Sequence, residues 1–143
     1  MLFARSEVPN PLNIINSYEE EWGLQLPLPD EREEIWSSEA SSHGDGEWIN
    51  VFYYNAEQNL DKSNMIPITD EDVTKVNNQI QNFIQRTISL YQNEEKTKKI
   101  EQIQVEAQIG DYYFYQSKNN EYDFFIAIYK SAEQKLYTFE WHQ

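Results

Sequence analysis

The chain of 143 residues contains no cysteine. This absence excludes a disulfide framework, a thiolate metal site and a cysteine nucleophile, and it is compatible with a reducing cytoplasm. No apolar run approaches the length of a membrane-spanning helix, and the first residues, MLFARSEVPNPLN, lack the apolar region of a secretory signal. We therefore expect a cytoplasmic protein that makes no membrane contact.

Basic residues are scarce. The chain has 11 lysines and arginines against 25 acidic residues, which leaves a formal net charge of −14. Such a charge disfavours binding to nucleic acid and to anionic membranes, and it favours a basic protein partner. Solubility alone would also account for the acidity.

Aromatic residues, in contrast, are abundant. The 4 tryptophans, 10 tyrosines and 7 phenylalanines supply enough apolar area to argue against a disordered chain of the same charge. A chain of this length is most simply one domain over residues 1–143, in which residues 1–10 are expected to form a flexible arm.

The C-terminal run from Asp111 to Gln143 predicts an antiparallel meander. Strands are expected at Tyr112–Tyr115, Phe124–Tyr129 and Leu136–Trp141, because aromatic and β-branched residues crowd these segments between polar clusters of hairpin-loop length. One face of this sheet is suited to a long helix. The other face carries a row of Tyr, Phe and Trp side chains. This row is either covered by a short helix or left partly exposed as a surface that favours association.

The remaining elements follow from patterns upstream. A short helix is expected to start at Pro11 and to end at Gly23, and a long helix to run from Asp70–Asp72 to Tyr91 or slightly beyond. Segments 33–38 and 47–55 predict a hairpin, whose second strand is central because it is apolar on both faces. Between them, LQLPLPD at 24–30 predicts an extended connector.

Two segments are ambiguous. Residues 93–99, NEEKTKK, suit either a frayed helix end or a loop. Ile100–Ile109 suits a helix or a strand, and its alternation favours a strand. The whole pattern predicts an α+β fold, with a mostly antiparallel sheet of five to six strands, one long helix packed on a face and a short N-terminal helix.

The stretch His43, Gly44, Asp45 and Gly46 resembles a functional motif, since it presents an imidazole and a carboxylate two residues apart in a glycine-containing loop. A glycine-shaped turn explains it better than catalysis or metal binding. The only other histidine is His142, and no Ser-His-Asp spacing, phosphate loop or HExxH helix is present. We therefore expect no enzymatic activity, no metal and no cofactor, with a minor enzyme using His43 and Asp45 as the least favoured reading.

Aromatic rings bordered by carboxylates are typical of protein interfaces. The alternatives are a small-molecule or glycan-binding module on the aromatic sheet face, or a structural or interaction protein. The candidate partner-binding residues are Glu19, Glu20, Glu21, Asp45, Glu47, Trp48, Tyr137 and Trp141.

Three stretches carry a resemblance to a known group. They are GLQLP at 23–27, SSHGDGEWINVF at 41–52 and YDFFIAIYKSAEQKLYTFEW at 122–141. In these stretches the chain resembles small uncharacterised proteins of Gram-positive bacteria with an HGDG loop, found among immunity proteins of polymorphic toxin systems. The resemblance implies a non-enzymatic antitoxin. Its partner would be a cognate basic protein, such as a nuclease toxin, that it blocks by occlusion.

Overall fold

The computed structural model describes residues 11–38, 45–91 and 93–143. Six strands form one antiparallel sheet in the order β1-β2-β6-β5-β4-β3. The strands are β1 (Glu31–Ser37), β2 (Gly46–Tyr53), β3 (Ile66–Pro67), β4 (Tyr112–Lys118), β5 (Asp123–Lys130) and β6 (Lys135–His142). The helices are α2 (Pro11–Trp22), α3 (Val73–Leu90) and α4 (Glu94–Glu101). The predicted α+β fold, the C-terminal meander and the central position of β2 are therefore confirmed.

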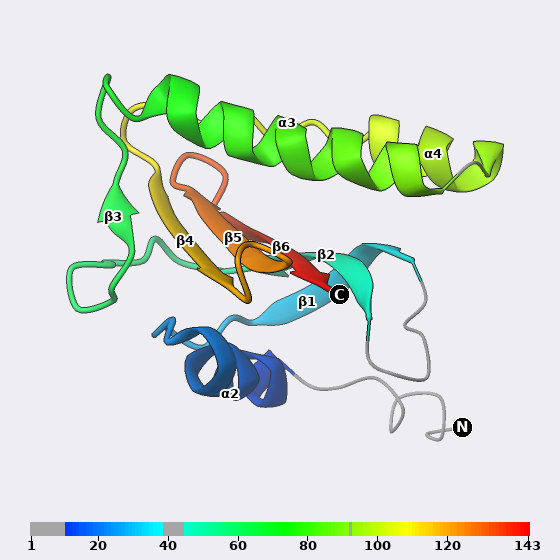
Figure 1. The fold of residues 1–143 in the computed structure, drawn as a ribbon. Helices are drawn as coiled ribbons and strands as arrows, with labels where there is room; N and C mark the ends of the chain where they lie inside the picture. Colours follow the sequence, from blue (N-terminus) through cyan, green and yellow to red (C-terminus); the bar gives the residue numbers. More distant parts are fainter. Residues whose placement is uncertain (1–10, 39–44, 92) are drawn as a thin grey trace.

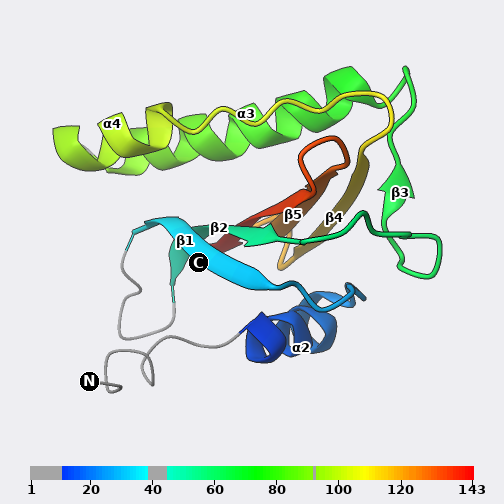
Figure 2. The same cartoon turned by 180° about the vertical axis from the view of Figure 1, so that it is seen from behind.

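The sheet is covered on both faces. Helix α3, followed by α4, lies along one face, and α2 lies against the opposite face (Figures 1 and 2). Because side chains alternate along a strand, Phe124 and Ile126 face α3 while Phe125 and Ala127 face α2. Aromatic side chains lie on both faces, since Phe124 and Trp141 are buried on the α3 side and Phe125 is buried on the α2 side. The expectation that Tyr, Phe and Trp side chains form a row on only the face opposite the long helix is therefore wrong.

Helix α2 ends as its sequence predicts. Gly23 has a φ of 78°, its N–H donates to the Glu19 carbonyl at 3.0 Å, and the Leu24 N–H donates to the Tyr18 carbonyl at 3.3 Å. These are the hydrogen bonds of a helix that terminates on a left-handed glycine. The turn points the chain from α2 into the extended connector and then into β1.

Side chains of α2 fix the helix on the sheet. Trp22 stacks on Phe125, with ring centroids 5.5 Å apart and an interplanar angle of 14°. The buried hydroxyl of Tyr18 shares a hydrogen bond of 2.8 Å with Thr138 of β6. An aromatic contact and a satisfied polar contact together set where the last turn of α2 lies relative to β6.

The predicted strand at 100–109 is wrong. Helix α4 continues to Glu101, and residues 103–108 form neither helix nor strand. The position beside β4 is taken by β3, and the Ala107 N–H instead donates to the Asn77 side chain on α3 at 2.6 Å. The alternation was real, since Val105 and Ala107 are buried and Glu106 is exposed. It reflects packing of one side of the segment and not strand pairing.

Residues 93–99 also differ from both alternatives considered. Helix α3 ends at Leu90, and α4 is a separate helix whose N-cap, Asn93, accepts hydrogen bonds from the Glu95 and Lys96 N–H groups. Two acids in its first turn and two lysines in its last turn match the helix dipole. None of the described helices is long and apolar enough to cross a membrane.

Candidate functional site

A cleft of about 400 Å³ lies between α2 and the sheet strands β1, β2 and β6. Its charged lining is Glu21 from α2, Arg32 and Glu34 from β1, and Glu140 and His142 from β6. Three carboxylates therefore face one guanidinium and one imidazole. The cleft is negative whether or not the imidazole is protonated, and it favours a cation.

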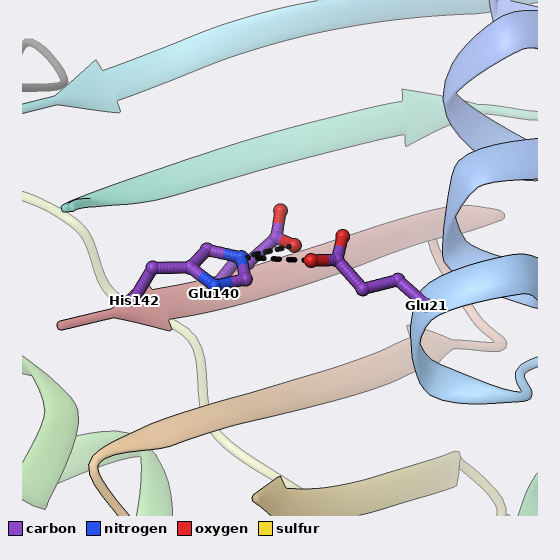
Figure 3. Close-up of side chains that lie close together, drawn as sticks. All are labelled: Glu21, Glu140 and His142. Atoms are coloured by element: carbon purple, nitrogen blue, oxygen red, sulfur yellow. Dashed lines mark hydrogen bonds and ion pairs between the residues drawn. The ribbon is translucent and has the colours of Figure 1, made fainter. Parts of the chain in front are cut away.

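Three of these side chains converge, as Figure 3 shows for Glu21, Glu140 and His142. Glu140 and His142 are two residues apart on β6, so the strand repeat places both on the face toward α2. Glu21 reaches them from the last turn of α2. Helix docking through Tyr18 and Trp22 is what brings its carboxylate to this point.

The distances within the cluster are short. His142 Nε2 lies 2.9 Å from Glu140 Oε2 and 3.6 Å from Glu21 Oε1. The Trp22 indole N–H donates to the same Glu140 Oε2 at 2.8 Å. One ligand atom from each of Glu21, Glu140 and His142 lies within 4.8 Å of the others, and no other group of this kind is found among the described residues.

The pKa values of His142 and Glu21 are both raised. The hydrogen bond to Glu140 raises the pKa of His142 against the opposing effect of burial, and the charges of Glu140, Glu21 and Asp123 raise it further. Burial raises the pKa of Glu21, as does the nearby Glu140 carboxylate, while His142 and Lys118 oppose that rise. The Glu140 carboxylate contributes to both shifts, whereas burial raises the pKa of Glu21 and opposes the rise in the pKa of His142.

Aromatic rings flank the imidazole. The centroids of Trp22 and Trp48 lie 5.5 and 5.7 Å from that of His142. Trp22 is buried between α2 and the sheet, and Trp48 is half-buried in the lining of the cleft. A cation entering the cleft would meet the Trp48 ring as well as the carboxylates.

The structure places the predicted partner-binding residues in different parts of the molecule. Only Glu21 and Trp48 line the cleft. Glu19 and Glu20 are exposed, but the helical repeat turns them away from Glu21. Tyr137 is half-buried on the α3 side of the sheet, and Asp45 is exposed just before β2.

The prediction that Glu47 and Trp141 contact a partner is wrong, because both side chains are buried in this structure. They pair across β2 and β6 on the α3 side of the sheet. Trp141 stacks on Phe124, and the Glu47 carboxylate accepts a hydrogen bond of 2.7 Å from the Tyr91 hydroxyl. Alternation along the strand predicts that Trp141 and Glu140 lie on opposite faces of the sheet. It does not indicate which of the two faces α3 covers.

Only the second half of the HGDG stretch lies within the described residues. His43 and Gly44 lie outside the described residues, so the prediction of a glycine-shaped turn stays a prediction. Gly46 is the first residue of β2.

A larger hollow of about 590 Å³ lies between α3, the segment after α4 and the β5–β6 turn. Its lining includes several side-chain amides and three carboxylates, Glu101, Glu106 and Glu133, but these carboxylates do not converge with a histidine. Its lysine, Lys130, is already paired with Asp111. Of the two hollows, the smaller one holds the converging ionisable groups. We therefore take the cleft beside α2 as the candidate site.

Sequence reasoning missed Glu34, Glu140 and His142 as site residues. The Glu-Trp-His spacing at the end of β6 was a usable signal, since a strand aligns the first and third side chains. No spacing in the sequence links these two residues to Glu21, which lies far from them along the chain.

Comparisons with protein-family models, with curated proteins and with solved structures found no match. The resemblance to immunity proteins therefore stays a prediction.

Proposed function

We propose that this chain is a non-enzymatic immunity protein of the cytoplasm, which binds a cognate toxin and blocks it by occlusion. The partner would be a basic protein, such as a nuclease whose substrate groove is positively charged. Carboxylates of the immunity protein would then stand where the phosphates of the substrate otherwise bind.

The observation that carries the proposal is the acidic cleft beside α2. Glu21, Glu34 and Glu140 gather there around the half-buried ring of Trp48, in a chain with a net charge of −14. A lysine or arginine side chain of a partner would find both ion-pair acceptors and an aromatic wall. The summed charge of the chain would also speed the encounter at low salt.

The edge of the sheet extends this acidic surface. Strand β1 pairs only with β2, and its Glu31, Glu33 and Glu34 are exposed. Charged edge strands also serve to prevent aggregation, so these acids alone would not identify a partner. Their value to the proposal is that Glu34 continues the lining of the cleft to the surface.

A glycan-binding module on the aromatic sheet face has no comparable support. Phe125 and Tyr129 are buried on the α2 side, and Phe124 and Phe139 are buried on the α3 side. Stacking on a sugar requires an open ring face. Of the aromatic residues predicted to contact a partner, Trp48 in the cleft and Tyr137 on the α3 side are half-buried.

Co-expression with any toxin domain that a neighbouring gene encodes tests the proposal. We expect the wild-type chain to relieve growth arrest and to bind the purified toxin domain more weakly as salt is raised. Glu34→Lys should weaken that binding at least tenfold, because it places a like charge against a basic partner. Glu31→Lys is the matched control, since it makes the same charge change on the same strand but on the opposite face.

Three results would contradict the proposal. Growth arrest that persists together with no detectable binding would exclude the antitoxin role. Equal losses for Glu34→Lys and Glu31→Lys would show that only net charge matters and that the cleft is not the contact. Binding that does not change with salt would remove the electrostatic argument.

A further inference from the structure

We propose that Glu21, Glu140 and His142 form a binding site for a divalent transition-metal ion, with Zn²⁺ as the best fit. Zinc is held in proteins by histidine nitrogen and carboxylate oxygen, and open sites use three protein ligands plus water. This cluster supplies one nitrogen and two oxygens from two elements, α2 and β6.

The spacing of the ligand atoms suits a tetrahedral ion. Ligands about 2.0–2.1 Å from a tetrahedral zinc lie about 3.3 Å from one another. The His142 Nε2 separations of 2.9 Å from Glu140 and 3.6 Å from Glu21 lie on either side of that value. The two carboxylate oxygens are at most 4.8 Å apart, so they would need to approach by no more than about 1.5 Å.

The ligands differ in how firmly they are held, which makes this approach feasible. Glu140 is oriented by the Trp22 indole N–H, a supporting contact from outside the cluster of the kind that metal-binding carboxylates receive. The Glu21 side chain is 43% exposed on the last turn of α2, so its carboxylate is free to adjust. The adjoining cleft offers space for a water as the fourth ligand.

The donor set selects among cations. Mg²⁺ and Ca²⁺ take oxygen ligands, and six or more of them, so an imidazole among three protein ligands disfavours both. With His142 neutral, the two carboxylates carry two negative charges against the two positive charges of the ion. Nε2 must lose its proton before it can bind the metal, so the ion would replace that proton between the two carboxylates.

The metal site does not rest on the proposed function. An ion bound here would neutralise Glu21 and Glu140, so it would compete with a cationic side chain of a partner for the same cleft. The two proposals can therefore fail separately, and the metal test needs no toxin.

Titration calorimetry of the purified full chain with Zn²⁺, in a buffer that contains Mg²⁺, tests the site. We expect one ion per chain. Glu21→Gln should weaken Zn²⁺ binding at least tenfold, and since Glu21 is exposed this variant should fold. Glu20→Gln is the matched control, because it removes the same charge from the neighbouring position of α2, and its affinity should equal that of the wild type. His142→Gln should abolish binding, while His43→Ala should leave it unchanged.

Several outcomes would overturn the inference. Wild-type chain that takes up no Zn²⁺ at one-to-one stoichiometry would exclude the site, as would Mg²⁺ competing at equal concentration. Glu21→Gln and Glu20→Gln weakening binding equally would indicate an adventitious ion attracted by surface charge. Loss of binding in His43→Ala would place the ion on the other histidine.

Discussion

The buried ion pair between Asp111 and Lys130 allows a sharp test of how charge is used inside this fold. The two side chains are only 6% and 7% exposed. Asp111 also accepts hydrogen bonds from the backbone N–H groups of Gln108, at 3.0 Å, and Ser131, at 3.1 Å. Lys130 also donates to the Glu106 carbonyl. The pair thus ties the segment before β4 to the turn between β5 and β6.

Asp111→Asn should destabilise the protein strongly. The amide oxygen can still accept hydrogen bonds but the amide NH2 group cannot, and the buried Lys130 ammonium is left with neutral acceptors only. Removing one partner of a buried ion pair costs about 3–5 kcal/mol. With a urea slope of about 2 kcal/mol per M, the unfolding midpoint should fall by about 1.5–2.5 M. Tryptophan fluorescence would follow the transition, since the chain contains 4 tryptophans.

A second ion pair on the same hairpin provides the control. Lys135 and Glu133 lie 3.9 Å apart, with side chains 35% and 49% exposed. An exposed pair contributes at most about 1 kcal/mol, so Glu133→Gln should shift the midpoint by no more than about 0.5 M. Equal shifts for Asp111→Asn and Glu133→Gln would refute the argument that burial decides the cost.

A double variant isolates the cost of leaving the Lys130 ammonium unpaired. Lys130→Met added to Asp111→Asn removes the unpaired ammonium, so the double variant should be more stable than Asp111→Asn alone. If the two substitutions instead added their costs, the loss in Asp111→Asn would come from its backbone contacts and not from the charge.

Two further perturbations follow from local geometry. Gly23→Ala should cost about 1–2 kcal/mol in urea unfolding, because Gly23 has a φ of 78° and a new Cβ would meet nothing within 4 Å, so the cost is confined to the backbone; Gly23→Asn should cost less, and equal costs would contradict this. The raised pKa of His142 means that its stabilising contribution is complete below the ordinary histidine pKa of about 6.5 and is lost as pH rises through the higher native value. Unfolding free energies measured with a chelator present should therefore fall over that interval in the wild type and stay level in His142→Gln, and parallel curves would rule out the linkage.

Much of the fold was determined by the local sequence. The alternation at 124–129 and 136–141 requires a strand with two different faces, and the apolar stripe from Val73 to Leu90 requires a helix with one. Gly23 marks the end of α2 because no other residue adopts its backbone angle as readily. These signals act over a few residues, so they can be read without the fold.

The same reasoning failed where an alternating pattern had two physical causes. Val105 and Ala107 are buried at alternate positions because one side of the segment packs, although β3 already occupies the edge of the sheet beside β4. Likewise, alternation along β6 separates Glu140 from Trp141, but it does not indicate which face α3 buries, and only the register of the sheet pairs Trp141 with Glu47.

The candidate site itself depended on the tertiary structure. The sequence determined that Glu140 and His142 share one face of β6 and that Glu21 stands in the last turn of α2, because both facts follow from backbone periodicity. Only the packing of Tyr18 and Trp22 on the sheet decided that Glu21 meets the other two. Contacts between chain ends depend on how whole elements dock, and local sequence spacing carries no information about that.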